Sequence, residues 1–232
     1  METLSKKAQG IVQRGSCMYY AKDFFEAAVE NDGVRLFSDT NPSGILACCV
    51  AENNLMPQHE LLEKLGAASQ QFSGDTLNYT NFCGIPELRQ ACASFLSRPD
   101  FVAHSVSPDD IVISSGMTGV LTGLAATLFN PGDSVLVPAP YYPNFDDDFN
   151  LWGDVKTVGV PFAESDDSGR LSDAALNQAY DQACIAGHPP KAMLVTNPNN
   201  PVGNIYSEGS LISIYQWCLS KKIHLIMDEA YA

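Results

Sequence analysis

Two polar side chains, Asn200 and Asp228, each follow a short apolar run, and one helix-length segment separates them. Asn200 lies in the stretch NPNNPVG at 197–203, and Asp228 opens the stretch DEAY at 228–231. If the apolar runs are neighbouring parallel strands, an amide and a carboxylate meet at one edge of a sheet. A carboxylate at the buried end of a strand needs a partner, such as a protonated ring nitrogen. The pair therefore predicts a site for a flat, charged heteroaromatic ligand.

Two further segments could serve such a ligand. The stretch SSGMTG at 114–119 lies between an expected strand and an expected helix, where backbone N–H groups and the helix dipole favour an anion. In PAPYYP at 138–143, prolines hold the chain extended and display a tyrosine that can stack on a planar ring. Each feature has a plainer reading: an ordinary strand-to-helix turn, a core tyrosine, or a helix-capping aspartate at 228. The turn matches neither the dinucleotide fingerprint nor the P-loop.

The elements that must position these groups follow from apolar patterning. Continuous apolar runs predict strands buried on both faces at 111–113, 135–137, 193–195 and 225–227. Amphipathic patterns predict helices at 58–71, 86–96, 120–128, 174–184 and 211–219, the last opened by Ser207 as N-cap. Strands that alternate with helices in this way are typical of an α/β layered domain with a mainly parallel sheet.

The order of these motifs resembles the class I/II aminotransferase superfamily, the fold type I pyridoxal phosphate enzymes. Within it, the chain looks most like the 1-aminocyclopropane-1-carboxylate synthase branch. The similar stretches are NPSGI at 41–45, AENNL at 51–55, GIPELR at 84–89, the loop from 116, and the segments 138–145, 197–203 and 228–231.

The resemblance implies a cofactor, pyridoxal 5′-phosphate, and a role for each matching residue. The implied phosphate ligands are Gly116, Met117 and Thr118, the implied ring-stacking residue is Tyr141, the implied ligands of the 3′-oxygen are Asn200 and Tyr231, and the implied partner of the ring nitrogen is Asp228. Glu52 matches a substrate-site glutamate of the cyclopropane-forming branch, although a surface carboxylate on a loop is the competing reading. Phe82 stands where that branch has a tyrosine, and it cannot donate a hydrogen bond.

The resemblance also implies a three-layer sandwich, with an N-terminal arm at 1–40 and residues 41–232 as the first part of the cofactor-binding large domain. The complete protein would be a homodimer that acts on a small amino acid, by transamination or by elimination. The family's Schiff-base lysine, which is the catalytic residue, has no counterpart before residue 232, so we expect an inactive fragment truncated before its C-terminal part. The alternative is a non-catalytic binding or regulatory protein that kept the scaffold.

Composition excludes several other classes. A net charge of −14 and a pI near 4.4 argue against binding to nucleic acid or to an anionic membrane. No apolar run is long enough to predict a membrane span, and seven cysteines without a CxxC pair predict free thiols in the cytoplasm. No GxSxG motif or metal-spaced histidine supports a hydrolase, and the run Asp146-Asp147-Asp148 is interpreted as a solvated face.

Overall fold

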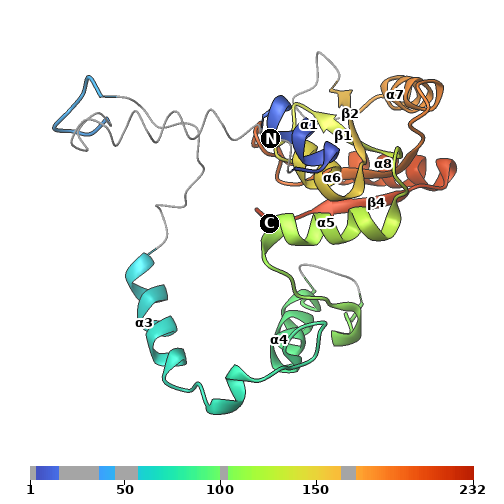
Figure 1. Ribbon diagram of the computed structural model, residues 1–232. Coiled ribbons are helices and arrows are strands. Elements are labelled where there is room, and N and C mark those ends of the chain that lie inside the picture. Colours follow the sequence, from blue (N-terminus) through green and yellow to red (C-terminus); the bar gives the residue numbers. More distant parts are fainter. Residues whose placement is uncertain (1–3, 16–36, 45–56, 100–103, 163–170) are drawn as a thin grey trace. The chain divides into compact units, whose positions relative to one another are not determined.

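A computed structural model describes residues 4–15, 37–44, 57–99, 104–162 and 171–232 (Figure 1). The chain divides into two compact units, one formed by residues 1–17 with 114–232 and the other by residues 18–113. The helices of the first unit are α1 (Lys6–Arg14), α5 (Gly116–Leu128), α6 (Phe145–Gly153), α7 (Asp173–Ile185) and α8 (Glu208–Lys221). Its strands are β1 (Ser134–Ala139), β2 (Lys156–Pro161), β3 (Pro190–Thr196) and β4 (His224–Asp228).

The four strands form one parallel sheet in the order β2-β1-β3-β4. Because successive side chains on a strand point to opposite faces, each central strand contributes to two cores. Leu136 and Met193 face α7 and α8, whereas Val137 and Leu194 face α5 and α6. Helices therefore cover both faces of the sheet, and the expected three-layer α/β sandwich is confirmed.

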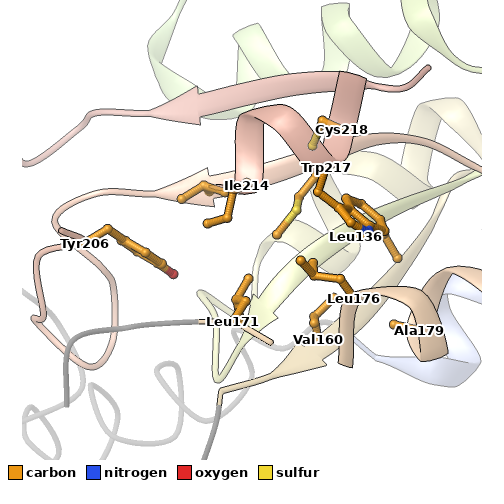
Figure 2. Packing of buried hydrophobic residues seen from close by; sticks show 11 residues of the cluster. Leu136, Val160, Leu171, Leu176, Ala179, Tyr206, Ile214, Trp217 and Cys218 are labelled. Atoms are coloured by element: carbon orange, nitrogen blue, oxygen red, sulfur yellow. The ribbon is translucent and has the colours of Figure 1, made fainter. Parts of the chain in front are cut away.

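The core on the α7–α8 face shows why these helices lie where they do (Figure 2). Leu176 on α7 and Ile214, Trp217 and Cys218 on α8 are buried against Leu136 of the sheet. Burial of such side chains contributes roughly 1.5–3 kcal/mol each relative to exposure. The stripe predicted on 211–219 was right only in part: Ile214 and Cys218 attach α8 to the sheet, as does Trp217, which the prediction did not include. Three residues of the predicted stripe are instead exposed, namely Ile212, Tyr215 and Leu219.

Capping fixes where α8 begins and ends. The Ser207 hydroxyl accepts a hydrogen bond from the Ser210 backbone N–H, as predicted for an N-cap. At the other end, Lys221 lies in the last turn and Lys222 takes the left-handed conformation, with a φ of 58°. The helix thus stops directly before β4 and delivers that strand toward Asp228.

The second unit contains α3 (Gln58–Ser69), the 3-10 helix η1 (Gly74–Leu77), α4 (Pro86–Leu96) and the 3-10 helix η2 (Pro108–Asp110). Gly84, just before α4, has a φ of +117°, and a Cβ there would lie 2.6 Å from Cγ1 of Ile113. Only glycine fits that position. The segment GIPELR therefore turns tightly into a helix that begins with a proline at its first position.

One predicted strand does not form, and one strand was not predicted. Residues 111–113 form no strand, because the Ile111 carbonyl accepts a hydrogen bond from Nε of Arg89 and the Ile113 N–H donates to the Cys83 carbonyl. These backbone groups have other partners, so no ladder forms. The sequence reading also missed β2, an edge strand whose apolar pattern is broken by Gly159 and ends in a proline.

The prediction that the three aspartates of α6 form a solvated face was also wrong. Asp147 and Asp148 are 8% and 3% exposed, and only Asp146 is exposed. Asp148 accepts a hydrogen bond from Nδ2 of Asn144 at 2.8 Å. A run of like charges was read as hydrated because its hydrogen-bonding partners are not evident from composition.

Candidate functional site

The carboxyl ends of β3 and β4 meet at one edge of the sheet. Thr196 and Asp228, the last residues of these strands, are register partners. The Thr196 hydroxyl donates to Oδ2 of Asp228 at 3.0 Å, and the Ala230 N–H donates to Oδ1 at 3.1 Å. Asp228 is only 6% exposed. Because a carboxylate has about four acceptor positions, these two bonds leave capacity for a further donor.

The loop after β3 uses its three asparagines differently. Oδ1 of Asn197 accepts from the Tyr206 N–H at 3.1 Å, and Oδ1 of Asn199 accepts from a backbone N–H three residues on. Both amides therefore hold the loop together. Nδ2 of Asn200 instead donates to the Tyr231 hydroxyl at 3.2 Å. Of the three, Asn200 is the amide that joins this loop to the segment after β4.

Tyr141 follows β1 and is held by its surroundings. Its hydroxyl donates to Oδ1 of Asp146 at 3.1 Å, and its ring stacks on Phe145 with centroids 6.4 Å apart and planes 23° apart. Burial, and then the neighbouring Asp146 carboxylate, raises the pKa of Tyr141 to about 12. The hydroxyl is therefore a hydrogen-bond donor throughout the neutral range.

The loop at 114–119 leads into the N-terminus of α5. Gly116, the first helical residue, has a φ of +69°, which favours glycine. A Cβ at Gly119 would lie 2.6 Å from the Ser114 hydroxyl oxygen, so glycine permits that close approach. Thr118 hydrogen-bonds Asp148, whose pKa is raised chiefly by burial. Met117 packs against the core beneath α5 and α6, so it could offer a ligand only its backbone.

These contacts connect most of the predicted site residues. Asn200 and Tyr231 bond to each other in the segments that follow β3 and β4, and Asp228 ends β4. Tyr141 follows β1, the strand beside β3. Helix α6 begins four residues after Tyr141 and contacts two of the predicted site residues. Its Asp146 bonds Tyr141, and its Asp148 bonds Thr118. Glu52 lies outside the described residues.

The sequence reading missed three residues that hold this region together: Thr196, Asp146 and Asp148. Thr196 had a usable signal, since it is the polar residue that ends the buried run 193–195, directly before the asparagine loop. The two aspartates had none, because their partners lie on a preceding loop and on another helix. Within the described residues no cluster of three metal-binding side chains occurs.

Known proteins resemble this chain in both sequence and fold. The chain is a parallel three-layer sandwich with polar groups at the carboxyl edge of its sheet. The family model for aminotransferases of class I and II matches residues 45–232, and the chain belongs to that family. Pyridoxal 5′-phosphate is the family's cofactor, as the sequence predicts. No helix among the described residues is both long enough and apolar enough to span a membrane.

Several curated relatives are 1-aminocyclopropane-1-carboxylate synthases. The chain is 35% identical to synthase 6 of Arabidopsis thaliana over all of its own length and 47% of that protein. It is 32% identical to the synthase of Glycine max, over 89% of the chain and 46% of the relative. The chain therefore spans about half the length of the curated relatives it matches.

Solved structures show the same fold. An archaeal alanine:glyoxylate aminotransferase superposes with a TM-score of 0.77 at 27% identity, over 97% of this chain and 52% of that one. An aspartate aminotransferase from Thermus thermophilus with maleate gives a TM-score of 0.72 at 24% identity, over 99% and 53% of the two chains. The second likeness concerns the fold alone.

The donor set fits the family's cofactor. Asp228 is buried and retains acceptor capacity, as a ring nitrogen that carries a proton requires. Asn200 and Tyr231 supply an amide and a phenol, the groups that bind a phenolic oxygen. Asp228 ends β4, and Asn200 and Tyr231 lie in the segments that follow the adjacent parallel strands β3 and β4, which is where ligands of open α/β sheets bind.

Proposed function

We propose that this chain forms the cofactor-binding part of a pyridoxal phosphate enzyme that transforms an amino acid. In this proposal residues 41–232 belong to the large domain, which the match beginning at residue 45 supports. The reaction is transamination, or an elimination at the β or γ carbon of the amino acid. When bound, the cofactor withdraws electrons from the α-carbon of the amino acid, provided that its ring nitrogen stays protonated.

The proposal assigns a role to each predicted residue. Asp228 holds the proton on the ring nitrogen, while Asn200 and Tyr231 donate to the 3′-oxygen, and Tyr141 covers one face of the ring. The backbone of Gly116 and Met117 and the hydroxyl of Thr118 bind the phosphate, where the N-terminus of α5 favours an anion. Glu52 contacts the amino-acid substrate. The observation that carries the proposal is the buried Thr196–Asp228 pair beside the Asn200–Tyr231 bond.

The lysines of the sheet lie at the edge opposite this site. Lys156 begins β2, Lys191 is the second residue of β3, and Lys221 and Lys222 precede β4. Lys222 lies six residues before Asp228, roughly 20 Å away at about 3.3 Å per strand residue. We therefore propose that none of these four lysines holds the cofactor by a covalent bond. The same observation favours the second candidate function, a non-catalytic protein that binds or senses the cofactor.

A binding experiment tests the site. We expect the purified chain to bind pyridoxal phosphate saturably, seen as quenching of protein fluorescence, and Asp228→Asn to weaken that binding. Borohydride reduction followed by peptide mapping should find no lysine of the sheet region modified at stoichiometric yield. Absence of saturable binding would refute the site. Stoichiometric labelling of one lysine in that region would refute the non-covalent proposal and the non-catalytic alternative.

Two further parts of the proposal concern assembly and compartment. The segment from α3 to Phe82 exposes apolar side chains, among them Leu62 at 67%, Phe72 at 71% and Leu77 at 90%, and no residue of α3 is buried. We propose that a second copy of the chain covers them, and a sedimentation experiment with Leu62→Glu tests this: the variant should shift toward monomer.

The described cysteines 83, 92, 184 and 218 are free thiols, which supports a cytoplasmic location.

A further inference from the structure

The first turn of α6 carries a carboxylate that the proposed roles leave unused. We propose that Asp146 is a positioning residue that orients the Tyr141 ring for stacking on the cofactor, an inference that rests on the proposed function. Asp146 is exposed, so it is not required to fill the core. Its Oδ1 nevertheless accepts the Tyr141 hydroxyl at 3.1 Å.

The ring needs more than one contact to be held in a fixed plane. The hydroxyl of a tyrosine lies on the axis about which its ring turns. A hydrogen bond to that oxygen therefore fixes where the ring points but not how its plane is rotated. The Phe145 ring, stacked at 6.4 Å with an interplanar angle of 23°, sets that rotation. Asp146 therefore fixes the direction in which the ring points, and Phe145, its neighbour in sequence, fixes the rotation of the ring plane.

A third contact limits the ring from the neighbouring strand. A Cβ added at Gly159 of β2 would lie 3.5 Å from Cε1 of Tyr141 and 3.2 Å from the Ala139 Cβ. The Tyr141 ring therefore lies close to the backbone of Gly159, and a side chain at that position would displace the ring. The three contacts come from β2 and from α6, both of which are parts of the sandwich itself.

The chemistry of the bond agrees with a positioning role. Burial, and then the Asp146 carboxylate, raises the pKa of Tyr141, so the phenol stays protonated and continues to donate. Two residues on, Asp148 hydrogen-bonds Thr118 at the N-terminus of α5. One turn of α6 thus contacts both the proposed stacking residue and a proposed phosphate ligand.

A double-mutant cycle tests whether Asp146 acts through Tyr141. The variants are Tyr141→Phe, Asp146→Leu and their combination, with Asp146→Asn as the conservative variant that keeps an acceptor oxygen. Asp154→Asn is the matched control, because it removes one carboxylate charge at the other end of α6 from an exposed left-handed residue that asparagine tolerates. The measured quantity is the dissociation constant for pyridoxal phosphate from fluorescence quenching.

We expect Tyr141→Phe and Asp146→Leu each to raise the dissociation constant about three- to tenfold, the effect of one hydrogen bond. The double variant should be no weaker than either single variant, because both remove the same bond. Asp146→Asn and Asp154→Asn should stay near wild type. If the two single-variant increases in dissociation constant multiplied in the double variant, the positioning role would be overturned and the proposed function would stand. An equal increase in Asp146→Asn and Asp146→Leu would have the same consequence. A wild-type chain that binds no pyridoxal phosphate would instead overturn the proposed function, and the inference with it.

Discussion

The two ends of the sheet are both polar, but their polar groups are used differently. At the amino end the Ser134 hydroxyl donates to the His188 carbonyl at 2.7 Å. Nδ1 of His188 lies 2.8 Å from the Gly132 carbonyl and Nε2 lies 2.6 Å from Nζ of Lys156. Since a carbonyl only accepts, Nδ1 carries the proton and Nε2 accepts from the lysine. These bonds join the first residues of β1 and β2 to the loop before β3 that carries His188.

At the carboxyl end, the groups keep hydrogen-bonding capacity after their internal bonds are made. Asp228 accepts two bonds and can accept more, and Asn200 brings an amide to the Tyr231 hydroxyl. Hydrogen bonds alone therefore do not mark a site. What separates the ends is whether a buried polar group retains an acceptor or donor for a ligand. The amino end is expected to govern stability and the carboxyl end to govern binding as well.

The largest expected effect comes from removing the buried carboxylate. Asp228→Leu leaves the Thr196 hydroxyl and the Ala230 N–H without their acceptor, so we expect the free energy of unfolding to fall by about 2–3 kcal/mol and cofactor binding to be lost. Ser134→Ala at the amino end should lower stability by about 1 kcal/mol and leave cofactor affinity unchanged. Urea unfolding and fluorescence titration measure the two quantities. If Asp228→Leu still bound the cofactor, the carboxyl end of the sheet would not differ from the amino end in its effect on binding.

A smaller change at the carboxyl end should separate binding from stability. Tyr231 is 54% exposed, so Tyr231→Phe should change the free energy of unfolding by less than about 0.5 kcal/mol. Its hydroxyl is nevertheless a proposed cofactor ligand, and we expect affinity to fall about tenfold. Tyr215→Phe on α8 is the control, because Tyr215 is 52% exposed and lies outside the site. Equal affinities in the two variants would remove Tyr231 from the site.

The carboxyl end should also carry an alkaline response. Tyr141 and Tyr206 follow the strands β1 and β3, and burial is the main reason why the pKa of each is raised to about 12. A phenol whose pKa is raised on folding stabilises the fold fully below its unfolded pKa of about 10. That contribution is lost as the pH rises to 12. Unfolding measured at pH 9, 10 and 11 should show a decline of at most about 1.4 kcal/mol per pH unit for each phenol. Tyr206→Phe should reduce the decline, and an unchanged decline would contradict the assignment.

The elements that sequence reading predicted well are those whose information is local. Runs such as 193–195 and 225–227 are continuous because their side chains contact a helix layer on both faces of the sheet, in the central strand β3 and in β4 at the end of the strand order alike. The N-cap at Ser207 needs only its own helix. The order of strands then places Asn200 and Asp228 at a common edge, so the centre of the candidate site was also predictable.

What could not be predicted depends on partners distant in the sequence. Residues 111–113 have the composition of a strand, but the Arg89 side chain, 22 positions earlier, takes the Ile111 carbonyl. Asp148 resembles a hydrated charge until Thr118 is placed beside it by the packing of α5 on α6. The strand β2 lacks a continuous apolar run because Lys156, Thr157 and Gly159 interrupt it, and of its six residues only Val160 is buried.

The smallest expected effects lie at the amino end, where two adjacent lysines should act in opposite directions. Nζ of Lys221 lies 4.8 Å from the centre of the Tyr180 ring and 5.8 Å from that of Trp217. Lys221→Met removes this cation–π contact and a favourable charge in the last turn of α8, so stability should fall by about 0.5–1 kcal/mol. Lys222 takes a left-handed conformation that glycine adopts without strain. Lys222→Gly should therefore raise stability by roughly 0.5 kcal/mol. Because neither lysine approaches the carboxyl end, cofactor titration should be identical in both variants, and any change in affinity would show that the two ends of the sheet are coupled.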